Sequence, residues 1–174
     1  MTDQLAIIDK ITTEHHSIRN HVRLVGDSLN DIEALFSLQR AHAGWTQASI
    51  ENLSGKKLQL QQALSQIDEG LRNHFTYEEK NLASLFGQAL TKALKIEHRE
   101  IMKEIERAEA VVAGTDLEGL NQKDKLSSKS RLWQSIGSIC QLIEQHATLE
   151  EQILRMIKKS LQSQAGQTKH VQIP

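Results

Sequence analysis

Residues 132–157 read LWQSIGSICQLIEQHATLEEQILRMI, and apolar side chains recur in this stretch three and four positions apart. That spacing gives a helix one apolar face, which is typical of helices packed in a bundle. Two polar residues, His146 and Glu150, occupy places on this face that the pattern otherwise fills with apolar residues. The whole face consists of Leu132, Ile136, Ile139, Ile143, His146, Glu150, Ile153 and Ile157.

Three further stretches show the same periodicity, and no segment alternates with the period of two that marks a strand. The only proline is the C-terminal residue, so nothing interrupts long helices. The sequence therefore predicts an all-α fold: an up-down-up-down antiparallel four-helix bundle in one domain over residues 1–162, followed by a polar, mobile tail over 163–174. The expected helices are 3–41, 46–86, 88–113 and 126–162.

Six polar residues stand on the apolar faces of these helices. They belong to a pattern that occurs twice, Glu-His-x-x-Ile followed by His-x-x-x-Glu-Glu. An ionised carboxylate buried without compensation costs several kcal/mol, and a metal ion removes that cost because it brings the opposite charge. We therefore expect these six side chains to be metal ligands: His15, His74, Glu78, His98, His146 and Glu150.

The spacing of the four histidines predicts that they lie at one height in the bundle. The sequence midpoints between successive histidines fall close to Gly44, Gly87 and the stretch 114–125, where turns are expected. In the symmetric arrangement one metal takes the first two histidines, the other metal takes the last two, and the two glutamates bridge. Two six-coordinate iron ions would keep positions for an oxo or hydroxo bridge and an external ligand.

Two alternatives to an iron pair remain open at this point. Any single histidine on an apolar face is commonly a hydrogen-bonded core residue without a ligand role. Histidine and glutamate ligands also suit zinc or manganese as substitutes for iron.

Composition excludes several classes of partner. The net charge is −1 and aromatic residues make up 3% of the 174 residues, which argues against nucleic acid. The chain shows no signal peptide and no apolar run of membrane-spanning length. The single cysteine, Cys140, precludes an intrachain disulfide and suits a cytoplasmic location.

With these motifs in place, the sequence resembles the hemerythrin-like (HHE cation-binding) domains over about residues 4–160. The resemblance rests on the order of helices, the order of ligands and the two His-x-x-x-Glu-Glu motifs. It implies a non-haem di-iron centre that binds oxygen or related small molecules. By position in the motifs it assigns the ligand roles to His15, His74, Glu78, His98, His146 and Glu150.

The chain departs from the oxygen carriers of that family. They have a fifth histidine where this chain has Met102, and their last carboxylate is typically an aspartate five residues after the histidine, whereas Glu150 comes four after. The four-histidine, two-glutamate set is closer to the iron-sulfur cluster repair proteins, although their extra N-terminal cysteine-bearing segment is absent from this sequence. The ferritin-like bundles, with their Glu-x-x-His pairs, do not fit.

Several other residues carry alternative roles. Glu79 and Glu151 are either hydrogen-bond partners of imidazole nitrogens or exposed charges. Tyr77 either donates a hydrogen bond to a bound ligand or carries an electron, or it packs at the bundle edge. Met102 is expected to pack beside the site or to act as a weak thioether ligand. The residues expected to lie off the site are His16, His21, His42, Cys140 and His170; Trp45 and Trp133 would cover one bundle end or join a homodimer contact.

Three functions follow from these observations. The first is a di-iron protein that binds or senses a diatomic ligand, oxygen or nitric oxide. The second is a di-iron enzyme acting on peroxide or nitric oxide, or in iron-sulfur cluster repair, and the absence of a fifth histidine motivates it. The third is a metal-storage or structural metal bundle. A separate redox or signalling partner is expected, with its identity open.

Overall fold

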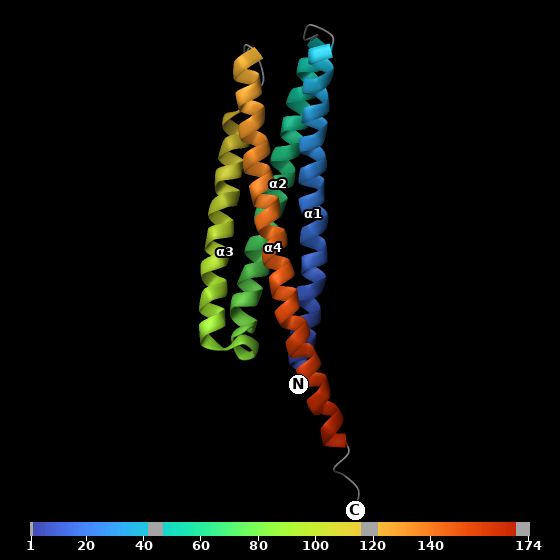
Figure 1. Ribbon diagram of the computed structural model, residues 1–174, viewed down its shortest axis with the longest axis vertical. Coiled ribbons are helices and arrows are strands. Elements are labelled where there is room, and N and C mark those ends of the chain that lie inside the picture. The colour runs from blue at the N-terminus through green and yellow to red at the C-terminus, as the bar shows by residue number, and fades with distance from the viewer. Residues whose placement is uncertain (1, 42–46, 116–121, 170–174) are drawn as a thin grey trace, which may run out of the picture.

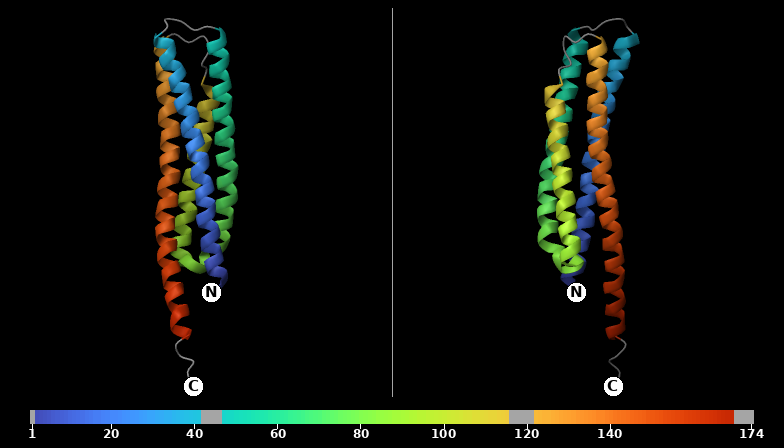
Figure 2. Two further views of the ribbon diagram at one scale, coloured as in Figure 1. Left: turned by 90° about the vertical axis from the view of Figure 1, so that its right-hand side faces the viewer. Right: turned by 60° about the vertical axis from the view of Figure 1, so that its left-hand side comes forward.

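A computed structural model describes residues 2–41, 47–115 and 122–169, and every element within these ranges is a helix. Each helix runs antiparallel to the next, and α4 packs against α1 to close the bundle (Figure 1, Figure 2). This confirms the predicted all-α four-helix bundle. The helices are α1 (Thr2–Ala41), α2 (Gln47–Asn81), α3 (Ala83–Gly114) and α4 (Gln122–Lys169).

The turn between α2 and α3 differs from the expected one. The helix predicted to reach residue 86 ends at Asn81, and α3 begins at Ala83. The backbone then leaves helical geometry at Gly87, with φ 72° and ψ 172°. Leu82 is fully buried, and Phe86 packs against the same apolar cluster, so burial of these side chains places the turn over residues 82–87.

The fourth helix is longer than expected. It was predicted to end at residue 162, but α4 continues to Lys169, so the first residues of the expected tail are helical. Ile157 and Leu161 pack against the apolar cluster that contains Ile8 and Ile11, so α4 contacts the bundle up to the expected end. Figure 1 shows α4 projecting beyond the other three helices. Residues 170–174, with His170, lie outside the described residues, as do His42, Gly44 and Trp45.

Two apolar clusters fill the bundle and leave a polar layer between them. The larger cluster begins directly above the layer with four residues, one from each helix: Ile18, Leu71, Ile101 and Ile143. The smaller cluster lies on the other side of the layer and consists of Ile8, Ile11, Leu82, Leu94 and Leu154. All of these residues except Ile8 lie three or four positions from a predicted ligand, which is one helical turn, and Ile8 lies seven positions from His15, which is two turns. The fold therefore places the six predicted ligands between two dry layers.

One detail of the fourth helix face corrects the sequence pattern. Ile153 was expected to continue the face after Glu150, but Leu154 is the fully buried residue and Ile153 is only half-buried. A step of four residues follows the 3.6-residue turn as well as a step of three. None of the described helices contains a stretch long and apolar enough to cross a membrane.

Candidate metal centre

The six predicted ligands converge at one level of the bundle. One histidine comes from each helix, and the two glutamates come from α2 and α4. We call these residues the inner six: His15, His74, Glu78, His98, His146 and Glu150. None of them is more than 3% exposed. The level predicted from the turn midpoints is therefore the level at which the structure places all four histidines.

Glu78 lies at the centre of this cluster. Its Oε1 is 2.8 Å from Nε2 of His74 and 3.6 Å from Nε2 of His15, whereas its Oε2 is 3.2 Å from Nε2 of His98. The two oxygens of one carboxylate thus face histidines from three different helices. This arrangement is what a carboxylate that bridges two cations requires.

The ligand atoms fall into two groups that share Glu78. The first group is His15, His74, Glu78 and Glu150; the second is Glu78, His98 and His146. Within each group the ligand atoms lie within 4.8 Å of one another. Glu150 joins only the first group, although its Oε2 is 3.6 Å from Nε2 of His146. The pairing of histidines agrees with the symmetric arrangement. Glu150 was expected to bridge as Glu78 does, but it falls in one group only, so the second group has three candidate ligands.

The inward-facing polar atoms of the inner six have no hydrogen-bond partner. This holds for Nε2 of all four histidines and for both carboxylate oxygens of Glu78 and Glu150. A buried polar group without a partner costs about 1–3 kcal/mol. Nitrogen and oxygen atoms that approach to 2.8–3.6 Å without hydrogen-bond geometry form two groups that could hold metal ions. Imidazole nitrogens and carboxylate oxygens are donors that suit divalent ions of the first transition row.

A second set of carboxylates faces the outer nitrogens of the same four imidazoles, three of them within hydrogen-bond distance and one within ion-pair distance. Nδ1 of His74 is 2.8 Å from Glu14, Nδ1 of His15 is 3.2 Å from Glu151, and Nδ1 of His98 is 3.2 Å from Glu79. Nδ1 of His146 is 3.5 Å from Glu97. We call these four glutamates the outer carboxylates.

The outer carboxylates explain residues that the sequence pattern had left open or missed. Glu79 and Glu151 bind imidazole nitrogens, which was one of their two alternatives. Glu14 and Glu97 had no assigned role, although each directly precedes a histidine in the repeated Glu-His-x-x-Ile motif. That repetition was the available signal. Their partners could not be read from it, because each glutamate contacts the histidine of another helix.

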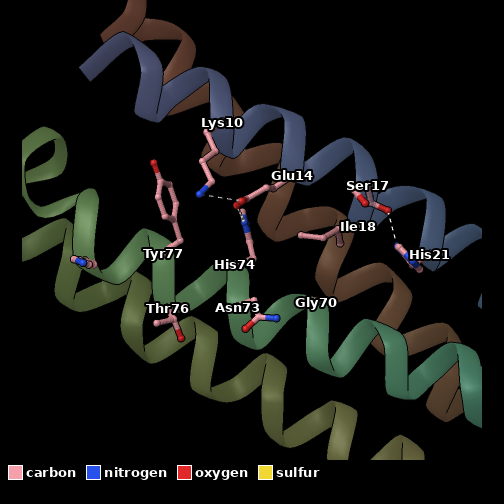
Figure 3. A pocket seen from close by; sticks show the side chains of 11 residues that line it. Lys10, Glu14, Ser17, Ile18, His21, Gly70, Asn73, His74, Thr76 and Tyr77 are labelled. Carbon is pink, nitrogen blue, oxygen red and sulfur yellow. Dashed lines mark hydrogen bonds and ion pairs between the residues drawn. The ribbon is translucent and has the colours of Figure 1, made fainter. Parts of the chain in front are cut away.

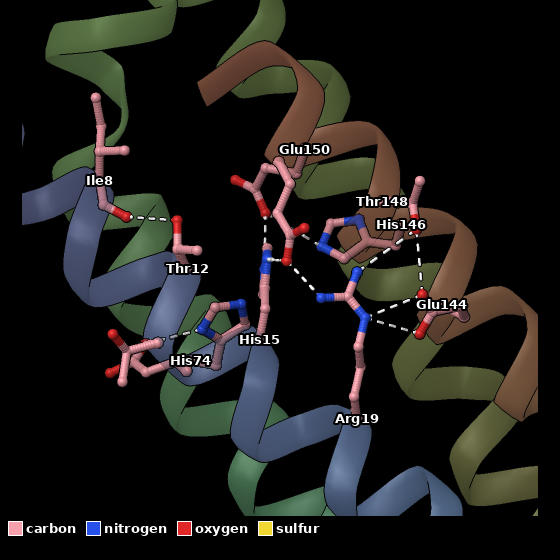
Figure 4. A network of polar contacts seen from close by, with 12 residues as sticks. Ile8, Thr12, His15, Arg19, His74, Glu144, His146, Thr148 and Glu150 are labelled. Carbon is pink, nitrogen blue, oxygen red and sulfur yellow. Dashed lines mark hydrogen bonds and ion pairs between the residues drawn. The ribbon is translucent and has the colours of Figure 1, made fainter. Parts of the chain in front are cut away.

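Arg19 connects the outer carboxylate of α4 to α1. Its Nη1 donates to Oε1 of Glu151, and its Nε donates to both oxygens of Glu144 at 2.9 and 3.0 Å. Figure 4 shows the guanidinium of Arg19 reaching from α1 to Glu144 and Thr148 on α4, beside His15. The Oε1 atom of Glu151 therefore accepts from both Arg19 and His15.

The carboxylates shift the pKa values of the metal-free site. Burial lowers the pKa of His15, but Glu150 and Glu78 outweigh it and raise that pKa from 6.5 to about 9. Burial raises the pKa of Glu78, but three surrounding imidazoles hold it well below 4.5. Burial and the charge of Glu78 raise the pKa of Glu150. The site thus holds protons until a metal ion replaces them.

A surface pocket of about 450 Å³ lies between α1 and α2. Figure 3 shows its wall beside Glu14, His74 and Tyr77. Since Glu14 binds Nδ1 of His74, the pocket reaches this histidine from its outer side. Lys10 lies 3.6 Å above the ring centre of Tyr77, so this tyrosine packs at the bundle edge, as one of its two alternatives proposed.

The remaining candidates lie around the centre. Phe75 is buried and stacks on His98, with ring centroids 3.8 Å apart, although the pattern did not mark it as core. Met102 and Cys140 are partly buried against the larger apolar cluster, and burial raises the pKa of the Cys140 thiol to about 11. His16 is exposed, as expected. His21 was expected on the solvated surface, but it is half-buried and bonded through Nδ1 to the carbonyl oxygen of Ser17.

Four helices that present buried imidazoles and carboxylates to one another define a cation-binding helical bundle. The family model of the hemerythrin HHE cation binding domain matches residues 6–157, and the chain belongs to this family. The matched region contains all of the inner six and all of the outer carboxylates. No curated protein and no solved structure matches the chain significantly.

Proposed function

We propose that this protein is a non-haem di-iron protein that binds or senses a small diatomic ligand, oxygen or nitric oxide, with the inner six as metal ligands. The observation that carries the proposal is the set of buried Nε2 and carboxylate oxygen atoms without hydrogen-bond partners. Iron, when bound, would supply a redox-active ion with coordination positions that the protein leaves free.

In this function the protein would position the metal ligands and exclude water from the space beside them. The His15 group offers four side chains, whereas the His98 group offers three, so the second position is the better candidate for an external ligand. Phe75 of α2 is buried against His98 and His146, and Ile101 is buried one helical turn from His98 on α3. An apolar wall favours a neutral diatomic molecule over water and ions, because it offers them no hydrogen-bond partners.

The proposal is tested by loading metal-free protein anaerobically with ferrous iron. We expect two iron ions per chain, near-ultraviolet and visible bands when oxygen or nitric oxide is added, and reversal of these bands under vacuum. Binding of fewer than two ions, or bands that never form, would contradict it. A colourless protein that takes two zinc ions and ignores iron would instead support a structural metal bundle.

A second function is favoured by one specific observation. The smaller group has three side chains, and Met102, four residues after His98, packs partly buried against the larger apolar cluster where the oxygen carriers have a fifth histidine. A metal position with this smaller group suits a di-iron enzyme that acts on peroxide or nitric oxide, or that donates iron in iron-sulfur cluster repair. Multiple turnovers with peroxide or nitric oxide would favour this function over reversible binding.

A further inference from the structure

The outer carboxylates form a closed ring around the bundle. Glu14 of α1 contacts the histidine of α2, Glu79 of α2 contacts that of α3, Glu97 of α3 contacts that of α4, and Glu151 of α4 contacts that of α1. Every helix thus supports the imidazole of the next helix, in one direction. This order follows from the repeated motifs only after the four helices have packed.

The outer carboxylates determine which nitrogen of each ligand histidine faces inward as an acceptor. An ionised carboxylate only accepts hydrogen bonds, so the Nδ1 atom that faces it must carry the hydrogen. In a neutral imidazole the lone pair then lies on Nε2, and Nε2 of all four rings faces the centre. A carboxylate that accepts from the outer nitrogen also makes the imidazole a stronger electron donor to a metal ion.

Nearby lysine and arginine side chains make the surroundings of the four outer carboxylates unequal. Arg19 donates to the same Oε1 atom of Glu151 that faces His15. Lys10 and Lys95 lie 3.7 and 3.5 Å from the other oxygens of Glu14 and Glu79. Within the described part of the chain, no lysine or arginine lies within ion-pair distance of Glu97. Arg19 is therefore the cation best placed to compete with an imidazole for its carboxylate.

We propose that Glu14, Glu79, Glu97 and Glu151 are positioning residues that fix the tautomers of the four ligand imidazoles and strengthen them as donors, and that Arg19 weakens this effect at His15 by sharing an oxygen of Glu151. The inference rests on the proposed metal centre. It assigns a role to every glutamate of the repeated motif that is not itself a metal ligand.

The first test uses zinc, which is diamagnetic, in protein labelled with nitrogen-15 at histidine. We expect four zinc-bound rings that carry hydrogen on Nδ1. The Glu97→Ala variant should then disturb the Nδ1 hydrogen of His146 and leave the adjacent His98 unchanged. The Glu14→Ala variant should disturb His74 and leave His15 unchanged. Disturbance of the sequence neighbour instead of the ring partner would overturn the inference.

The second test measures zinc affinity by chelator competition. Each alanine variant should lose about 10- to 100-fold in affinity. The corresponding glutamine variant should recover much of this loss, because its amide oxygen still accepts a hydrogen bond. The matched control is Glu100→Gln, an exposed carboxylate two residues from His98. Equal affinities for wild type and all four alanine variants, with intact thermal unfolding, would overturn the positioning role.

The third test separates the role of Arg19 from a general charge effect. In the iron-loaded protein, Glu151→Gln should raise the reduction potential and Arg19→Gln should lower it. In the Glu151→Gln background, Arg19→Gln should have almost no further effect, because Arg19 acts through the shared oxygen. An unchanged effect in that background would show that Arg19 acts only through its field, and would overturn this part of the inference.

The tests keep the two proposals apart. A wild-type protein that takes up no zinc and no iron would remove both. A protein that binds zinc but shows no oxygen or nitric oxide chemistry with iron would contradict the proposed function, and the zinc experiments would still decide the role of the outer carboxylates.

Discussion

Glu78 and Glu150 have the same position in the repeated motif but different surroundings. Glu78 belongs to both ligand groups, whereas Glu150 belongs only to the group of His15. A single residue that serves both metal positions should matter more than one that serves a single position.

We therefore expect Glu78→Gln to reduce metal uptake from two ions per chain to less than one. Glu150→Gln should retain at least one ion, held by the His98 group. His16→Ala, on the exposed side of α1, should bind as wild type does. Metal analysis after gel filtration measures all three. Equal losses in the two glutamine variants would contradict the unequal roles.

The raised pKa of His15 predicts how the metal-free protein responds to pH. A group whose pKa is higher in the folded state stabilises the fold fully below its unfolded pKa, and that stability is lost as the pH rises through the folded pKa. For His15 these values are 6.5 and about 9. The raised pKa of Glu150 acts in the same direction.

The metal-free protein should thus become less stable between about pH 6.5 and pH 9. Urea unfolding at a series of pH values measures this change. The His15→Gln variant, which lacks the titrating group, should show a weaker dependence. Stability that rises over this range in the metal-free wild type would contradict the pKa direction of His15.

At the scale of the elements, the turn between α2 and α3 determines how the two halves of the site meet. Gly87 has φ 72° and ψ 172°, a backbone region that is almost restricted to glycine. The space around it is open, so a substitution there is disfavoured by backbone strain and not by a clash. The turn joins the helices that carry Glu78 and His98.

We expect Gly87→Ala to lower the free energy of unfolding by about 1–3 kcal/mol. Gly137→Ala is the matched control, because Gly137 is exposed within α4 and also has open space around its Cα atom. That control should raise stability by about 0.5–1 kcal/mol, since alanine favours helix more than glycine does. Chemical denaturation of both variants tests the contrast in sign.

At the scale of the whole molecule, the polar layer interrupts an otherwise continuous core. In the metal-free protein its inward-facing nitrogen and oxygen atoms lack hydrogen-bond partners, and it lies between the two apolar clusters. A cation bound by either ligand group would contact three helices, and the two groups together span all four. Bound cations would therefore stabilise the association of the helices and not one helix alone.

Metal should therefore raise the thermal stability of the entire bundle in one transition. At free zinc concentrations about 100-fold above Kd, each site should contribute about 2.7 kcal/mol. Differential scanning calorimetry with and without a chelator measures the shift. The Glu78→Gln variant should show a much smaller one. A separate transition for α1 and α2, with the other helices unaffected, would contradict the coupling.

The periodic faces of the four helices made the bundle predictable, because alternation of three and four residues has one common outcome for an antiparallel chain with short turns. The inner six were predictable for a related reason. Each is a polar residue on the same helix face as Leu or Ile neighbours, such as His98 between Leu94 and Ile101. Such residues can be recognised from the sequence pattern. Their proximity in the folded chain followed from turn positions alone.

The partners of the outer carboxylates were decided only by the tertiary structure. Glu14 adjoins His15 in sequence but contacts His74, and Glu97 adjoins His98 but contacts His146. Periodicity locates the face of a residue on its own helix, whereas these contacts depend on how adjacent helices rotate and cross. Unequal ligand groups and the oxygen shared with Arg19 depend on the same rotations. The sequence by itself thus determined the bundle and its buried polar layer, and packing of helix against helix determined which outer carboxylate faces which imidazole.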